Sequence, residues 1–150
     1  MSTEPGPFPY EIAFARNLGW LTEWEQQALR GKRVAIAGMG AVGGNYVLTL
    51  ARLGVGAFHI ADLDQFEYAN FNRQIGATLD SIGKPKVDVI AAMAQRINPE
   101  LEIRSFRDGL LASNIDAFLE GVDLFLDGLD FFVLEIRRRV FARCWELGIP

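Results

Sequence analysis

Hydrophobic residues lie along the chain in short runs, separated by longer stretches in which they recur every three or four positions. The runs at 33–37 and 57–61 are almost wholly apolar, which is typical of parallel strands buried on both faces. With two less regular runs they predict four strands, at residues 33–37, 57–61, 101–106 and 123–126. The longer stretches have the period of amphipathic helices and predict helices at residues 22–30, 41–53, 85–97, 114–120 and 131–147.

Residues with special conformational preferences support some of these boundaries. Thr22 and Glu25 have the spacing of a capping box at the start of the first predicted helix. Pro85 suits the first turn of a helix, where its missing N–H group costs nothing. Two segments have no regular pattern: we expect a long irregular loop at 65–84 and a loose N-terminal arm at 1–10.

The alternation of predicted strands and helices determines the expected fold class. It predicts an α/β fold, a Rossmann-like parallel sheet with right-handed crossovers and helices on both faces. Residues 148–150 end the sequence where a fifth strand is expected, so we expect a sheet truncated before its second half. We divide the chain into an N-terminal arm and helix, 1–21, and a main domain, 22–150.

Composition narrows the class of protein. The 150 residues are 50% hydrophobic and 23% charged, which suits one folded domain and excludes wholesale disorder. A formal net charge of −4 argues against a nucleic-acid partner bound through a basic surface. The uncharged stretch 34–51 contains several glycines, Asn45 and Thr49, so we expect no membrane span and no membrane partner.

The N-terminus and the cysteine content bear on location. Residues 1–9 are polar and Pro-rich, without the apolar stretch of a secretory signal. A single cysteine, Cys144, excludes an internal disulfide and a zinc site built from cysteines of this chain. We therefore expect a cytoplasmic protein.

A glycine-rich turn follows the first predicted strand. Gly38, Gly40 and Gly43 form the pattern GxGxxG between a strand and a helix, where the first glycine makes the tight turn and the second lets a phosphate approach the backbone. The third lets the helix pack on the strand. Asp62 ends the second predicted strand, where a carboxylate can accept hydrogen bonds from ribose hydroxyls. These features indicate an adenine nucleotide, either NAD or ATP.

Three further polar clusters favour ATP over NAD. We expect all of them at the carboxyl ends of neighbouring strands, close to the glycine turn. Arg73 offers a bidentate fork for phosphate oxygens, Lys86 a compact positive charge at a helix start, and Asp130 a carboxylate for Mg²⁺. A triphosphate with magnesium needs such groups, whereas a diphosphate dinucleotide does not. The clusters are Asn70-Phe71-Asn72-Arg73-Gln74, Gly83-Lys84-Pro85-Lys86 and Asp127-Gly128-Leu129-Asp130.

With these motifs in this order, the sequence resembles the adenylation domain of the ThiF/MoeB family, bacterial relatives of ubiquitin-activating enzymes. The resemblance runs from about residue 16 to residue 150, and Ala41 stands where the family commonly has glycine. It also rests on further motifs: Arg16-Asn17-Leu18-Gly19, Asp62-Leu63-Asp64 and Ile97-Asn98-Pro99.

The resemblance implies an activity and its residues. The activity is adenylation of a protein's C-terminal carboxylate by Mg-ATP, with release of pyrophosphate, on a small ubiquitin-like or sulfur-carrier protein. It further implies a homodimer in which Arg16 of the N-terminal segment reaches the partner subunit's triphosphate. By similarity, the ribose, the phosphates and the metal would be contacted by Gly38, Gly40, Ala41, Gly43, Asp62, Asp64, Asn70, Asn72, Arg73 and Lys86, with Asp130 on Mg²⁺.

Other residues have simpler interpretations. We expect Cys144 to be a buried structural thiol and His59, in the middle of a predicted strand, to be a core residue. The run 137–139 of three arginines is expected on a solvated helix face. We expect packing roles for the aromatic side chains of Phe125, Phe131, Phe132, Phe141 and Trp145.

Two other functions remain open at this point. An NAD(P)-dependent oxidoreductase explains the glycines and Asp62 but gives no role to Arg73, Lys86 and Asp130. A non-catalytic nucleotide-binding or dimerisation module is the other, because Phe131-Phe132 follows Asp130 where the family more often has asparagine.

Overall fold

The computed structural model describes residues 7–150 of the chain. Four strands form its sheet: β1 (Arg33–Ala37), β2 (Ala57–Ala61), β3 (Glu102–Phe106) and β4 (Leu124–Asp127). Six α-helices accompany them: α1 (Tyr10–Ala13), α2 (Glu23–Arg30), α3 (Gly43–Leu53), α4 (Lys86–Ile97), α5 (Ile115–Leu119) and α6 (Leu134–Leu147). Short 3₁₀ turns are η1 (Ala15–Asn17), η2 (Tyr68–Asn70) and η3 (Leu79–Ser81).

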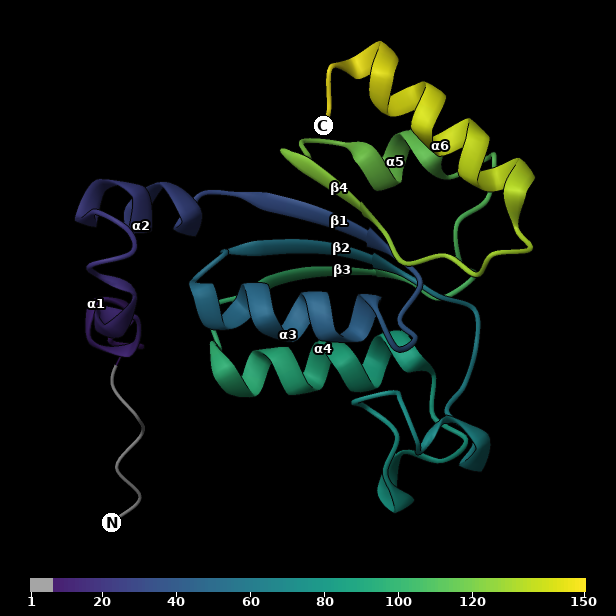
Figure 1. The fold of residues 1–150 in the computed structure, drawn as a ribbon, viewed down its shortest axis with the longest axis horizontal. Coiled ribbons are helices and arrows are strands. Elements are labelled where there is room, and N and C mark those ends of the chain that lie inside the picture. Colours follow the sequence, from purple (N-terminus) through teal and green to yellow (C-terminus); the bar gives the residue numbers. More distant parts are fainter. Residues whose placement is uncertain (1–6) are drawn as a thin grey trace.

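The sheet is parallel throughout, with strand order β3-β2-β1-β4. Ala35 of β1 pairs with His59 of β2 and with Phe125 of β4. Helices α3 and α4 cover one face and α5 and α6 the other, which confirms the predicted fold class (Figure 1). In chain order, β2 and β3 are added on one side of β1, and the chain then crosses back to place β4 on the other side of β1. Parallel sheets bind ligands at such a reversal, outside the carboxyl ends of the strands.

Alternating side chains of the strands supply two hydrophobic cores. Val34 and Ile36 face the core under α3 and α4, whereas Ala35 and Ala37 face the core under α5 and α6. Because both faces are covered, the runs at β1 and β2 are apolar at nearly every position. Cys144 and His59 are buried on the α5 and α6 side, as the sequence predicts.

The element boundaries follow the sequence prediction closely at most positions. The capping box at α2 is confirmed, since Thr22 Oγ1 accepts from the Glu25 N–H at 3.2 Å and Glu25 Oε2 accepts from the Thr22 N–H at 2.7 Å. Two helices begin later than predicted: α3 starts at residue 43 and α6 at residue 134. The turns before these two helices contribute residues to the cavity described below.

The N-terminal segment is more ordered than a loose arm. Tyr10 is almost wholly buried, and its Oη donates to the Gly54 carbonyl at 2.6 Å. Phe14 is buried as well, and its ring packs edge-on against Tyr10. The prediction for 1–10 is therefore wrong at Tyr10, because this ring and Phe14 cover the end of α3, while residues 1–6 lie outside the described part.

Several aromatic residues expected to pack are exposed instead. Phe125 is buried, but Phe131, Phe132, Phe141 and Trp145 are exposed, with Trp145 at 87%. The packing prediction holds for Phe125 and Phe141, whose rings meet edge-on with centroids 5.6 Å apart, and is wrong for Phe131, Phe132 and Trp145. Trp145 is exposed because α6 turns Val140 and Cys144 toward the sheet, whereas Phe131 and Phe132 lie in the loop before α6. Among residues 7–150, no helix has both the length and the continuous apolar character required to cross a bilayer.

Candidate nucleotide-binding site

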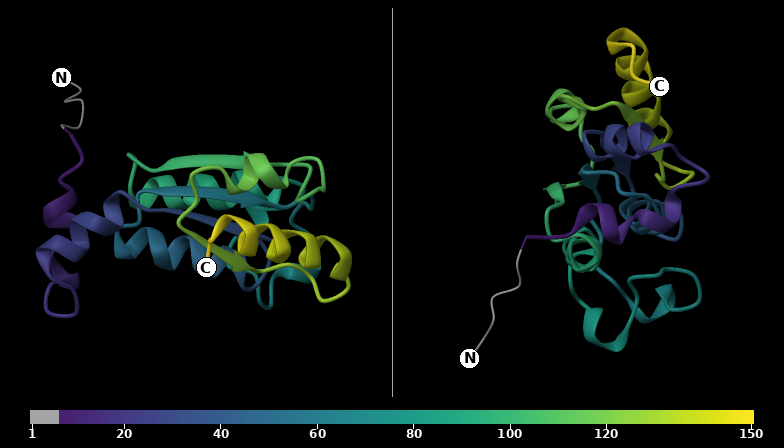
Figure 2. Two further views of the ribbon diagram at one scale, coloured as in Figure 1. Left: turned by 90° about the horizontal axis from the view of Figure 1, so that it is seen from above. Right: turned by 90° about the vertical axis from the view of Figure 1, so that its left-hand side faces the viewer.

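A cavity of about 510 Å³ opens at the carboxyl ends of β1, β2 and β4. Figures 1 and 2 show that three connecting segments converge at this end of the sheet: those after β1, β2 and β4. Most of the predicted site residues line the cavity: Gly38, Gly40, Ala41, Asp62, Asp64, Arg73, Lys86 and Asp130. Gly43, Asn70, Asn72 and Arg16 do not belong to its lining.

The three glycines of the turn are required for different reasons. Gly38 has φ +88°, and a Cβ there would lie 2.2 Å from the Gly128 carbonyl oxygen of the neighbouring loop. A Cβ on Gly43 would lie 1.7 Å from the Gly38 carbonyl oxygen, so this glycine allows α3 to pack against the turn. A Cβ on Gly40 would meet only the Gln74 side chain, at 3.7 Å. Gly40 therefore leaves space at the cavity, as a phosphate approaching the backbone requires.

Asp62 fixes the turn from the end of β2. Its Oδ2 accepts from the Met39 N–H at 2.6 Å, and its Oδ1 accepts from the Asp64 N–H at 2.8 Å. Each carboxylate oxygen has two lone pairs, so both can accept a second hydrogen bond. Asp62 can thus order the glycine turn and still bind ribose hydroxyls in the cavity.

Lys86 brings a buried positive charge to the same place. Only 7% of its side chain is exposed, and Nζ lies 3.0 Å from Oδ2 of Asp64, which is itself 58% exposed. An ammonium group has three N–H donors, and a buried charge is costly unless it is paired. The Lys86–Asp64 pair leaves two donors of Nζ for an anionic ligand.

The loop after β2 contributes Arg73 but uses its asparagines to hold its own shape. Arg73 Nη1 donates to the Ala69 carbonyl at 2.9 Å and to Asn72 Oδ1 at 3.0 Å. Asn70 is buried, and its Oδ1 accepts from the Glu67 N–H at 2.9 Å. In this arrangement Asn70 and Asn72 act on the path of the loop and not on the cavity surface.

Asp130 lies in the loop between β4 and α6, and this loop is held by a residue that the sequence analysis placed in solvent. Arg137 is 20% exposed, its Nε lies 2.7 Å from Asp127 Oδ2, and its guanidinium also donates to carbonyl groups of the loop. The prediction for 137–139 is therefore wrong at Arg137 and confirmed for the two arginines after it, which are exposed. The helical spacing could have indicated that Arg137 is partly buried, because Arg137 lies on the same helix face as Val140 and Cys144, three and seven positions further on, and both are buried.

Gln74 is a cavity residue to which the sequence analysis gave no role. It is 92% buried and lines the cavity, and its Oε1 has no hydrogen-bond partner among the described residues. Buried polar atoms are rarely left unsatisfied, so this amide fits a ligand that supplies the missing partner. With the open Gly40, two cations and three carboxylates, the lining has the groups that a magnesium nucleotide requires.

Arg16 lies far from this cavity. It is an exposed residue of η1, between α1 and α2, and both helices flank the amino ends of the strands (Figure 1). Within one chain, Arg16 therefore does not contribute to the cavity at the carboxyl ends.

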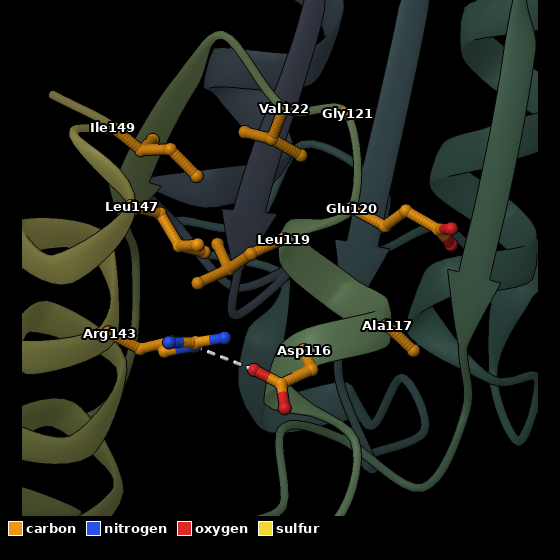
Figure 3. A pocket seen from close by; sticks show the side chains of 9 residues that line it. All are labelled: Asp116, Ala117, Leu119, Glu120, Gly121, Val122, Arg143, Leu147 and Ile149. Atoms are coloured by element: carbon orange, nitrogen blue, oxygen red, sulfur yellow. Dashed lines mark hydrogen bonds and ion pairs between the residues drawn. The ribbon is translucent and has the colours of Figure 1, made fainter.

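A second cavity, also of about 510 Å³, lies between α5 and α6 (Figure 3). Its lining is largely aliphatic, with one ion pair of 2.7 Å between Arg143 Nε and Asp116 Oδ1. None of the predicted site residues lines it, so it is separate from the candidate site.

The parallel sheet, the glycine turn at the strand reversal and the acid at the end of β2 define a Rossmann-like nucleotide-binding protein. The chain belongs to the ThiF family, whose model matches residues 14–150. The family resemblance predicted from the motifs is thereby confirmed.

Relatives and solved structures agree with this membership. The chain is 39% identical over 90 residues to the tRNA threonylcarbamoyladenosine dehydratase of Bacillus subtilis, covering 60% of this chain and 35% of that protein. It is 36% identical over 99 residues to ubiquitin-like modifier-activating enzyme 5 of Drosophila melanogaster, covering 65% of this chain and 24% of that protein. The crystal structure of the Escherichia coli dehydratase TcdA in complex with ATP superposes with a TM-score of 0.88 at 28% identity, over 93% of this chain and 57% of that one. The chain thus spans about a third of the bacterial relative and under three-fifths of the solved structure.

Proposed function

We propose that this chain is the ATP-binding part of an adenylyltransferase that activates a carboxylate. One observation carries the proposal: a single cavity brings together Asp62, the buried Lys86, Arg73 and the Asp130 carboxylate. This set suits a nucleoside triphosphate with magnesium better than it suits a dinucleotide. Family membership and the ATP complex of the E. coli relative support the same ligand.

The proposed acceptor is the C-terminal carboxylate of a small ubiquitin-like or sulfur-carrier protein. Its pKa is about 3.5, so at neutral pH it is already ionised and needs no general base. One of its oxygens forms a bond to the α-phosphorus of ATP, the bond from that phosphorus to the bridging oxygen breaks, and pyrophosphate leaves with the electron pair. The products are an acyl-adenylate and pyrophosphate.

The residues of the cavity would promote this step by positioning and by charge. Asp62 holds the ribose and fixes the glycine turn, while Lys86 and Arg73 neutralise the phosphate oxygens as charge shifts to the leaving pyrophosphate. Asp130 would hold Mg²⁺, which supplies Lewis-acid charge to the phosphates when it is bound.

The proposed assembly is a homodimer with composite sites. Arg16 is exposed at the end of the molecule remote from its own cavity, which is compatible with a role in the partner subunit's site. A second copy is therefore the proposed source of an arginine for each triphosphate. The cytoplasm is the proposed location, because the single cysteine is free and buried.

The first test is thermal melting of the chain with Mg-ATP, with ATP and EDTA, and with NAD, at equal millimolar concentrations. A ligand at about 100 times its Kd stabilises the folded state by about 2.7 kcal/mol, a clearly measurable shift. We expect the largest shift with Mg-ATP. A shift with NAD alone would contradict the proposal and favour an oxidoreductase.

The second test identifies the acceptor. Relatives are named for different acceptors, a tRNA nucleoside and a ubiquitin-like modifier. Incubation with Mg-ATP and candidate carrier proteins, followed by mass spectrometry, should show an added AMP on the carrier's C-terminus. An adenylate on tRNA instead would overturn the proposed acceptor, and the absence of a nucleic-acid partner stays a prediction until then.

A further inference from the structure

One side chain organises the loop between β4 and α6. The Arg137 guanidinium donates through Nη2 to the Leu129 carbonyl at 2.7 Å and to the Asp130 carbonyl at 3.1 Å. Its Nη1 donates to the Phe131 carbonyl at 3.3 Å, and its Nε to Asp127 Oδ2 at 2.7 Å. A planar guanidinium suits such a set, because its donors are fixed relative to one another.

The two carboxylates of this loop have different surroundings. Both oxygens of Asp127 are engaged, Oδ2 by Arg137 and Oδ1 by the Leu129 N–H at 3.0 Å. Among residues 7–150, the Asp130 carboxylate receives only a long contact, from the Phe132 N–H to Oδ1 at 3.5 Å. Asp130 lines the cavity and Asp127 does not. Asp127 is therefore occupied in holding the loop, and Asp130 is the carboxylate available to a ligand.

Burial distinguishes Arg137 from the arginines beside it. The side chains of Arg137 and Asp127 are only 20% and 24% exposed, so their ion pair is partly shielded from water. Arg139 pairs with Glu135 at 2.8 Å on the surface, with 55% and 73% exposure. Exposed pairs of this kind contribute little to stability. The helix thus offers a matched control for Arg137.

We propose that Arg137 is a positioning residue that holds the loop from Asp127 to Phe131, so that the Asp130 carboxylate is preorganised to bind the divalent cation of the nucleotide. This inference rests on the proposed function, since it takes Asp130 as the metal ligand. Groups that orient a metal ligand typically change metal affinity by about ten- to hundredfold when they are removed.

The test measures ATP binding by calorimetry across a Mg²⁺ series, with an EDTA arm, on the wild-type chain and on Arg137→Met, Arg137→Lys and the control Arg139→Met. For Arg137→Met we expect the half-saturating Mg²⁺ concentration to rise by at least about tenfold. ATP affinity in EDTA should change less than about twofold, because the cavity cations are untouched. Arg137→Lys keeps a charge for Asp127 but loses the fork, so its shift should be intermediate.

Each outcome decides one point. An unchanged Mg²⁺ requirement in Arg137→Met, or equal losses with and without Mg²⁺, would overturn the inference while leaving ATP binding intact as a proposal. A wild-type chain that binds ATP without any Mg²⁺ dependence would overturn it as well. Absence of ATP binding by the wild type would overturn the proposed function itself. If Arg137→Met does not fold, Arg137→Lys against Arg139→Met gives the same decision.

Discussion

Gly40 and Gly43 stand three positions apart in one turn, yet they meet different neighbours. A methyl group at position 43 would collide with the Gly38 carbonyl oxygen, directly after β1. A methyl group at position 40 would point to open cavity space beside Gln74. The pattern GxGxxG identifies both glycines, but only the packing shows which one serves the fold and which one serves a ligand.

Alanine at these two positions should therefore have different effects on stability and on ATP binding. We expect Gly43→Ala to lower the free energy of unfolding by more than about 3 kcal/mol, because backbone atoms would have to move. Gly40→Ala should change it by less than about 1 kcal/mol and weaken ATP binding by about tenfold, because the methyl group occupies the place of a phosphate. Urea unfolding and ATP titration measure the two quantities. Normal ATP affinity in Gly40→Ala would contradict a phosphate at this turn.

His59 makes stability depend on pH. The ring is buried, and its Nδ1 lies 2.7 Å from the Phe118 carbonyl oxygen. Burial lowers the pKa of His59, and the positive charges of Arg33 and Arg104 lower it further. The hydrogen bond to the Phe118 carbonyl and the negative charge of Glu102 raise the pKa, but the net shift is downward. Above the unfolded pKa, about 6.5, both states are neutral and the effect is zero. As pH falls below that value the unfolded state gains the proton first, so the folded state loses stability.

Between pH 7.5 and 5.5, His59 should lower the free energy of unfolding by at most about 1.4 kcal/mol, because pH 5.5 lies one unit below the unfolded pKa and one unit corresponds to about 1.4 kcal/mol. Urea midpoints at the two pH values would measure it. His59→Leu removes the titrating group and should flatten the dependence over this interval. An equal pH dependence in the leucine variant would assign the effect to other groups.

At the scale of elements, local sequence rules succeed where a helix end depends on its own neighbours. Thr22 and Glu25 satisfy each other's backbone groups at the start of α2, and these contacts are complete within four residues. Strands β1 and β2 are likewise found where their apolar runs predict them. The prediction is weaker for the start of α6, because residues 131–133 are apolar and belong to the predicted helix, whereas Arg137 holds this segment in the loop after β4.

The capping box gives a direct test at this scale. Thr22→Ala should lower the free energy of unfolding by about 1 kcal/mol, because the Glu25 N–H loses its acceptor at the helix start. Thr49→Ala, at an exposed position inside α3, is the control and should change it by less than about 0.5 kcal/mol. Denaturant midpoints compare the two variants. If Thr49→Ala lowered the free energy of unfolding as much as Thr22→Ala, the capping box would have no special role in stability.

At the scale of the whole molecule, α1 and α2, between which Arg16 lies, are at one end of the sheet, and the carboxyl ends of the strands are at the other (Figure 1). The cavity opens at those carboxyl ends. If each site takes Arg16 from a second copy, variants defective in Arg16 or in Lys86 should complement each other. A dimer of one Arg16→Ala subunit and one Lys86→Met subunit contains one site with both native residues. Random mixing should therefore restore about a quarter of the sites.

Pyrophosphate exchange or ATP binding by the mixed variants would measure this recovery. Each variant alone should be defective, and the mixture should exceed their average. No recovery, in a mixture shown by mass spectrometry to contain mixed dimers, would exclude an Arg16 contribution across subunits. An Arg16→Ala chain with unchanged ATP affinity would show that Arg16 has no part in the site.

The sequence alone determined the α/β class, the order of the elements and the glycine turn with Asp62, because these depend on periodicity and on neighbours close in the chain. It also predicted that Lys86, Arg73 and Asp130 lie together, because parallel strands bring their carboxyl ends to one edge of the sheet, and these residues do line one cavity.

Only the tertiary structure determined the roles of individual side chains around that cavity. In the folded chain, Asn70 is buried and bonds to its own loop, and Gln74 is buried beside the cavity with an oxygen that has no partner among residues 7–150. Arg137 donates hydrogen bonds to the loop between β4 and α6 that contains Asp130. The hydrogen bonds of Asn70 and Arg137 are to nearby residues, but which side chains are buried and which face the cavity depends on how the loops and α6 pack on the sheet. Residue type and spacing carry little information about that packing.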